Sequence, residues 1–170
     1  MIDIREYRRL RGEETSFKDF LMTPVPGAAD SGFTDLLDTN VLSEPQRPRP
    51  SEAVLGWLRS VRPEELWTSA VVVGELRKGV ELLRLRDATR AGCLDEWLSV
   101  LVRSYGDRIL PVTTEIAEEW GHLDAPDPLP VLDGYLAATA RMHGLTLATR
   151  NVKDIERSGA SWLNPFEWQG

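Results

Sequence analysis

Acidic side chains stand where strands of this chain are predicted to end or helices to begin. Asp38 follows a short apolar strand, Glu75 lies near the start of the helix after the second strand, and Asp133 opens the helix before the fourth. Clustered carboxylates resist ionising together, and a hard divalent cation such as Mg²⁺ or Mn²⁺ relieves that cost. The residues therefore indicate metal-assisted hydrolysis of a phosphodiester, with a metal-activated water as the nucleophile.

Other polar side chains accompany these acids at the predicted strand ends. They are Asn40, Ser69, Thr149 and Asn151. Asp154 follows Asn151 by three positions and is a secondary candidate for the same cluster. No cysteine or histidine accompanies these residues in the motifs, which favours a site built only from oxygen ligands.

Each acid also has an ordinary structural explanation. Asp38 can stabilise the turn after its strand, and Asp133 can be the N-cap of a helix. Glu75 can be a solvated helix charge, and Asp154 a loop or capping residue. The metal site is favoured because all four acids are expected at the same edge of the sheet. Four unrelated structural roles would have to place them there by coincidence, at the edge where α/β proteins bind ligands.

The pattern from Thr34 onward alternates short strands with longer helices. Strands are predicted to end at Leu37 and to cover residues 66–69, 108–112, 145–148 and 162–163. Helices are predicted over residues 50–60, 72–85, 88–105 and 132–143, with a further one beginning at 113–116. This alternation predicts an α/β fold with a mostly parallel central sheet of four to five strands, covered by helices on both faces.

Length and charge narrow the classes of protein that fit. The 170 residues suit one domain with a short appendage, and 20 basic against 27 acidic residues give a net charge of −7. That balance argues against a broad basic surface for duplex binding. With one cysteine, a charged N-terminus and no apolar run of about 20 residues, we expect a cytoplasmic protein without a membrane segment.

Four motifs, in order along residues 36–166, resemble the PIN-domain toxins, and in particular the VapC/FitB-like toxins of bacterial type II toxin–antitoxin systems. The motifs are Leu36-Leu-Asp-Thr-Asn-Val-Leu-Ser-Glu-Pro45, Ser69-Ala-Val-Val-Val-Gly-Glu-Leu-Arg-Lys-Gly79, Asp133-Gly-Tyr-Leu-Ala-Ala-Thr-Ala140 and Leu147-Ala-Thr-Arg-Asn-Val-Lys-Asp154. The resemblance implies a PIN-like three-layer α/β/α fold. It also implies a dimeric endoribonuclease dependent on Mg²⁺ or Mn²⁺ that cleaves structured RNA, such as tRNA or rRNA.

The resemblance also assigns roles to residues. Asp38, Glu75 and Asp133 would be the catalytic acids and metal ligands. Asn40 would orient Asp38 or contact the metal-bound water, and Thr149 would support the ligands from behind.

A fourth ligand is less clearly defined, because Asn151 stands where some relatives have an acid. Either Asn151 binds the metal through its amide oxygen or Asp154 replaces the missing acid; otherwise the site holds a single metal. The alternative function is a catalytically weak or inactive PIN module that binds RNA or protein. A phosphatase of the haloacid-dehalogenase type is disfavoured, because it needs a second Asp where this chain has Asn40.

Basic residues near the motifs are candidates for holding RNA phosphates, although a solvated face explains any one of them equally well. They are Arg77, Lys78, Arg150 and Lys153.

Residues 1–33 precede the PIN-like region 34–170 and read as a helix followed by a Pro- and Gly-containing linker. Residues 8–22 resemble the C-terminal tail of a partner antitoxin. We therefore expect regulation either by a cognate antitoxin or by this fused tail, with an unrelated extension as the alternative. In the inhibitory interpretation, aromatic residues fill an apolar groove and arginines approach the carboxylates; these candidates are Phe17, Phe20, Arg8, Arg9 and Arg11.

Overall fold

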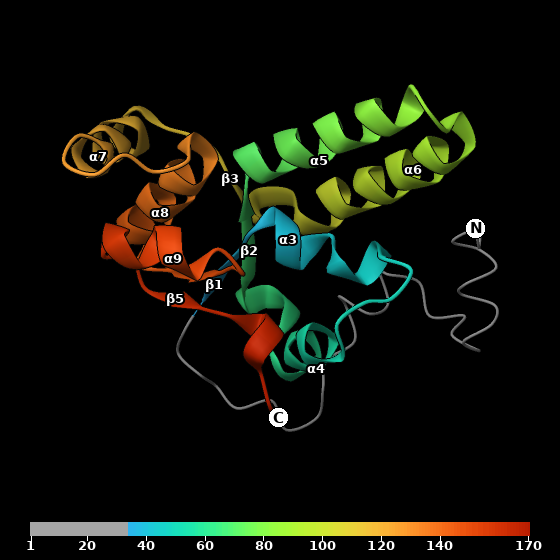
Figure 1. Cartoon of the computed structure of the whole chain (residues 1–170), viewed down its shortest axis with the longest axis horizontal. Helices are drawn as coiled ribbons and strands as arrows, with labels where there is room; N and C mark the ends of the chain where they lie inside the picture. Colours follow the sequence, from blue (N-terminus) through green and yellow to red (C-terminus); the bar gives the residue numbers. More distant parts are fainter. Residues whose placement is uncertain (1–33) are drawn as a thin grey trace.

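The computed structural model describes residues 34–170, which form a sheet flanked by helices (Figure 1). The predictions for the N-terminal segment lie outside the described residues. They concern the antitoxin-like helix and its candidates Arg8, Arg9, Arg11, Phe17 and Phe20.

The centre of the molecule is a parallel five-stranded sheet with the strand order β3-β2-β1-β4-β5. The strands are β1 (Asp35–Leu37), β2 (Leu66–Ser69), β3 (Ile109–Leu110), β4 (Thr146–Ala148) and β5 (Trp162–Leu163). From the central strand β1 the chain builds one half of the sheet outward through β2 and β3, and the other half through β4 and β5. The order reverses between β1 and β4, and such reversal points open a crevice at the carboxyl ends of the strands.

Helices cover both faces of this sheet, which confirms the predicted three-layer α/β/α fold (Figure 1). The α-helices are α3 (Thr39–Leu42), α4 (Glu52–Ser60), α5 (Ala70–Arg84), α6 (Ala88–Tyr105), α7 (Thr114–Asp124), α8 (Val131–His143) and α9 (Val152–Ile155). Single 3₁₀ turns are η1 (Glu44–Gln46), η2 (Pro63–Glu65), η3 (Gly106–Arg108), η4 (Glu156–Ser158) and η5 (Pro165–Glu167). The pairs α5–α6 and α7–α8 pack as two helical hairpins.

Local sequence sets where these elements begin and end. Ser51 and Thr113 cap α4 and α7 by accepting backbone N–H bonds, as their positions predict. Ser69 caps α5, which therefore begins two residues earlier than the apolar spacing indicates. The third strand is shorter than the predicted 108–112, because Arg108 belongs to η3 and Pro111 has no N–H to continue the ladder.

The core lies between the sheet and the helices. Leu36, Leu37 and Leu147 are fully buried on the two central strands. Apolar residues of α4, α5, α6 and α8 complete the same cluster. Among residues 34–170, no helix is both long and apolar enough to cross a membrane.

Candidate active site

Asp38 lies directly after the central strand β1, at the carboxyl edge of the sheet. It occupies the N-cap position of α3, but its side chain makes no capping bond. Its backbone N–H donates to the carbonyl of Ala148 at the end of β4, at 3.1 Å. The residue is 4% exposed. Asp38 is therefore a buried carboxylate at the strand end whose side chain does not cap α3.

The Asp38 carboxylate is held by side chains from both central strand ends. Thr149 Oγ1 donates to Asp38 Oδ2 at 2.6 Å, and the Asn40 amide donates to the same oxygen. The Asn40 amide nitrogen also reaches Thr149 Oγ1 at 3.2 Å, and its oxygen accepts the Arg150 backbone N–H at 3.2 Å. These bonds join the start of α3, which follows β1, to the residues after β4 in one polar network.

Two further acids approach from the helices. Glu75 lies in the second turn of α5, and its Oε2 accepts a hydrogen bond from Thr39 Oγ1 at 2.5 Å. Asp133 is the third residue of α8, whose N-cap is Pro130, so Asp133 does not cap the helix. The Asn151 amide lies 3.4 Å from Asp133 Oδ2 as a donor. Asn151 thus presents its NH₂ group to the acid.

The acids influence one another electrostatically. Burial raises the pKa of Asp133 to about 6, and the charges of Asp38, Asp154 and Glu75 contribute to that increase. Burial also raises the pKa of Asp38, with Glu75 adding to the effect while the bond from Thr149 opposes it. Asp38 after β1, Glu75 in α5, Asp133 in α8 and Asp154 in α9 therefore lie close enough for their charges to interact.

Three further polar residues, Ser69, Asp154 and Thr39, contact the elements that carry the acids or the acids themselves. Ser69 is buried, and its hydroxyl accepts the Val71 N–H at the start of α5, the helix that carries Glu75. Asp154, in α9, pairs with Arg157 at 3.7 Å while its charge reaches Asp133. Sequence reasoning did not single out Thr39, whose contact with Glu75 spans 36 positions. Its place between Asp38 and Asn40 was the only available signal.

The chemistry of this donor set suits a hard cation, because every candidate ligand is an oxygen. As the side chains lie, no three Asp, Glu, His or Cys residues within 34–170 are grouped so that they could hold a metal ion. Each acid instead has its own partner: Thr149 and Asn40 for Asp38, Thr39 for Glu75, and Asn151 for Asp133.

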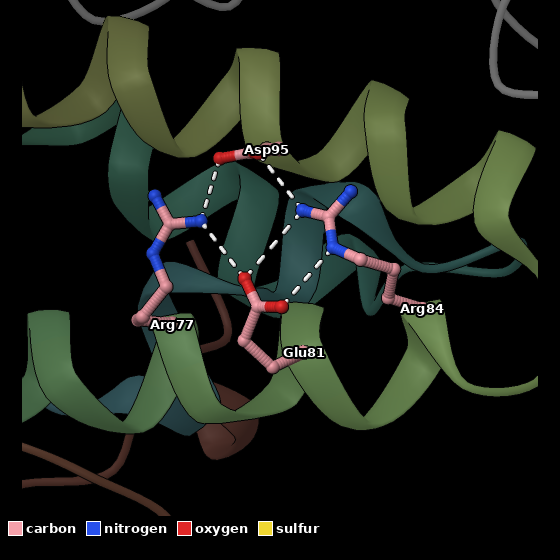
Figure 2. Close-up of polar contacts among 4 residues, drawn as sticks. All are labelled: Arg77, Glu81, Arg84 and Asp95. Carbon is pink, nitrogen blue, oxygen red and sulfur yellow. Dashed lines mark hydrogen bonds and ion pairs between the residues drawn. The ribbon is translucent and has the colours of Figure 1, made fainter.

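The candidate RNA-binding residues differ in whether their charged groups are already paired with acids. Arg77 Nη1 contacts Asp95 at 2.6 Å and Glu81 at 3.5 Å, and Arg84 binds the same two acids (Figure 2). This network links α5 to α6. Arg150 instead lies over the Phe166 ring, with its guanidinium carbon 4.9 Å from the ring centroid. The remaining candidates, Lys78 and Lys153, are exposed.

Comparison with known proteins fits this geometry. The family model described as "PIN domain" matches residues 36–158, which include all four acids. The chain belongs to the PIN-domain family. This PIN domain is 37% identical over 137 residues to Toxin FitB of Neisseria gonorrhoeae, covering 77% of this chain and 97% of that toxin.

A second relative and a solved structure support the same family assignment. The PIN-domain chain is 34% identical over 140 residues to VapC ribonuclease Y4jK of Sinorhizobium fredii, covering 78% of this chain and 97% of that protein. The crystal structure of FitAcB from Neisseria gonorrhoeae superposes with a TM-score of 0.74 at 36% identity, covering 79% of this chain and 99% of that one. The predicted resemblance to FitB- and VapC-type PIN toxins is therefore confirmed.

Proposed function

We propose that this PIN-domain protein is the ribonuclease toxin of a type II toxin–antitoxin system, and that it hydrolyses structured RNA such as tRNA or rRNA in the cytoplasm. What supports the proposal is the hydrogen-bond network that Thr149 and Asn40 make with Asp38 where β1 and β4 end, with Glu75, Asp133 and Asp154 nearby. The similarity to a VapC ribonuclease supports the choice of reaction.

In this proposal Asp38, Glu75 and Asp133 hold Mg²⁺ or Mn²⁺, with Asn151 or Asp154 as a further ligand. Such a cation supplies an activated water and neutralises charge developing on the phosphate. The protein's own part is positional. Thr149 and Asn40 both donate to Asp38 Oδ2 and so orient its carboxylate, while Thr39 and Asn151 donate to Glu75 and Asp133 and orient theirs.

A binding-only PIN module is the second candidate. The observation in its favour is Asn151, a neutral donor to Asp133 at a place where an acid would add charge for a second cation. In this case the crevice would bind RNA without cleaving it.

The two functions separate in one experiment. The full-length chain, the chain without residues 1–33 and the Asp38→Asn variant of each are incubated with total RNA in Mg²⁺, in Mn²⁺ and in EDTA. The ribonuclease proposal expects metal-dependent cleavage that Asp38→Asn abolishes. Asp107→Asn is the matched control, because Asp107 is exposed in η3, before the amino end of β3 and so away from the site. RNA binding without cleavage in any metal favours the binding module.

We also propose a cognate antitoxin and a second copy of this chain as partners, from membership in the toxin family. Residues 1–33 are proposed to act as a fused inhibitory tail on the basis of their antitoxin-like sequence. Removing residues 1–33 should then increase RNA cleavage. Unchanged or lower cleavage by the shortened chain contradicts the inhibitory tail, and light scattering of the full chain tests the dimer.

A further inference from the structure

Arg150 differs from the other arginines beside the site in what its guanidinium contacts. Arg77 is paired with Asp95 and Glu81, and Arg157 with Asp127. Within residues 34–170 no carboxylate pairs with Arg150, which is exposed and lies over the Phe166 ring. Stacking covers one face of a guanidinium and leaves its in-plane N–H donors available for an anion.

The backbone of Arg150 is anchored to the acidic network. Its N–H donates to Asn40 Oδ1, and the neighbouring Thr149 hydroxyl binds Asp38. The backbone of Arg150 therefore adjoins the network that holds Asp38, and its guanidinium extends from there to the Phe166 ring. A group of acids repels a polyanionic substrate, so a cation held beside them would favour binding of a phosphate backbone.

Contacts around the C-terminal turn fix the position of Phe166, the residue beneath Arg150. β5 is parallel to β4, so the chain leaves it at the same carboxyl edge, and Phe166 follows in η5. Asn164 Oδ1 accepts the Phe166 N–H at 3.1 Å, and the intervening Pro165 is buried. Beyond it, the Trp168 ring packs so closely on Gly56 of α4 that a Cβ there would collide with it. The C-terminal turn is thus held in place under Arg150.

We propose that Phe166 is a positioning residue that holds the Arg150 guanidinium at the rim of the carboxylate site, where Arg150 binds a phosphate of the RNA backbone. This inference rests on the proposed ribonuclease function and specifies how the substrate is held. Phe166 acts through Arg150 and does not touch the reacting atoms.

The test measures binding of a labelled mixed-sequence RNA to the full-length chain in EDTA over a series of KCl concentrations. Arg150→Ala should weaken binding about tenfold at low salt. It should also reduce the slope of log K against log salt by about one. Phe166→Leu, which keeps apolar volume but removes the ring, should weaken binding roughly two- to fivefold. Phe166→Tyr should restore it. Arg86→Ala, an exposed arginine beyond the far end of α5, is the matched control for lost charge.

A double-mutant cycle separates positioning from general structural support. If Phe166 acts only through Arg150, then adding Phe166→Leu to Arg150→Ala causes no further loss. Additive losses, or an Arg150→Ala slope equal to that of Arg86→Ala, overturn the inference. Should the wild-type chain cleave RNA in Mg²⁺ in that case, the proposed function still stands. A chain that neither binds nor cleaves RNA, whether or not residues 1–33 are present, overturns both.

Discussion

Thr149 Oγ1 donates a hydrogen bond of 2.6 Å to Asp38 Oδ2, joining the residue after β4 to the residue after β1 across 111 positions. The threonine is 1% exposed and the aspartate 4%. Burial raises the pKa of Asp38, and this hydrogen bond is the strongest influence that lowers it. The threonine therefore both aims the carboxylate and favours its charged form, which a cation ligand requires.

Thr149→Val removes that donor while conserving shape. We expect the free energy of unfolding to fall by about 1–3 kcal/mol, since a buried carboxylate loses a hydrogen bond. Where the chain cleaves RNA, the rate should fall roughly 10- to 100-fold, as for lost support behind metal ligands. Urea unfolding and single-turnover cleavage measure the two effects. Thr149→Ser keeps the hydroxyl and is the matched control; equal losses in both variants would contradict the role of the hydrogen bond.

Asp133→Asn should separate stability from activity. The pKa of Asp133 is raised to about 6 by burial and by the other acids, so its charge at pH 7 costs folding free energy. Because Asp133 is only partly buried, we expect the variant to be more stable by about 1 kcal/mol in EDTA. It should nevertheless lose RNA cleavage.

Mg²⁺ titration of the melting temperature provides the check on Asp133. The wild-type chain should be stabilised by Mg²⁺, because a cation bound only to the folded state shifts the folding equilibrium. The melting temperature of the Asp133→Asn variant should rise less with Mg²⁺. A gain equal to that of the wild-type chain would remove Asp133 from the ligand set.

Asp35 gives the protein a pH-dependent instability away from the site, at the amino end of β1. It is 4% exposed, and burial followed by the Glu65 charge raises its pKa from 3.8 to about 6. The folded state therefore binds the proton more tightly than the unfolded state. Asp35 lowers the free energy of unfolding as pH rises from about 4 to 6, and this cost persists above 6.

Asp35→Asn should accordingly match the wild-type chain below about pH 4 and be more stable at pH 7.5 by about 1–3 kcal/mol. Urea unfolding at several pH values measures the difference between the two proteins, which cancels contributions from other carboxylates. A difference that is constant with pH would show that the pKa of Asp35 is not raised on folding.

Much of the site follows from the sequence, because parallel strands bring their carboxyl ends to one edge. The apolar pair Leu36-Leu37 defines β1, and Asp38 must then project from its end. Contacts set by the packing of distant elements were not predictable in this way. The bond from Thr39 to Glu75 depends on how α3 approaches α5, and periodicity along one element carries no such information.

The same limit applies to the basic residues. Their positions in the sequence made Arg77 and Arg150 equivalent candidates. The register of the α5–α6 hairpin pairs Arg77 with Asp95, 18 positions away, whereas the C-terminal turn places Phe166 beneath Arg150. Only the three-dimensional arrangement distinguishes an arginine already paired with acids from one with free donors.

Asp95→Asn tests whether those ion pairs restrain Arg77. The carboxylate binds Arg77 at 2.6 Å and Arg84 at 2.9 Å, and its removal leaves both guanidinium groups with fewer partners (Figure 2). We expect RNA affinity to rise roughly two- to fivefold at low salt, with a steeper salt dependence, if Arg77 can reach a phosphate. Asp107→Asn is the control for lost negative charge. No difference between the two variants would remove Arg77 from the RNA-binding candidates.

Gly134→Ala should damage the helix that presents Asp133. A Cβ at Gly134 would lie 2.8 Å from Trp120 Cδ1, and that indole stacks on Tyr135 with 4.9 Å between ring centroids. The α7–α8 hairpin must therefore shift, and we expect the free energy of unfolding to fall by about 1–3 kcal/mol, with reduced cleavage.

Gly121, in the interior of α7, is the matched control for Gly134. A Cβ there meets nothing within 4 Å among the described residues, so Gly121→Ala should raise the free energy of unfolding by about 0.5–1 kcal/mol through helix propensity alone. The two alanine variants should thus shift the urea midpoint in opposite directions. Shifts of the same sign would mean that the Trp120 contact does not fix the position of α8. Other contacts would then have to position Asp133.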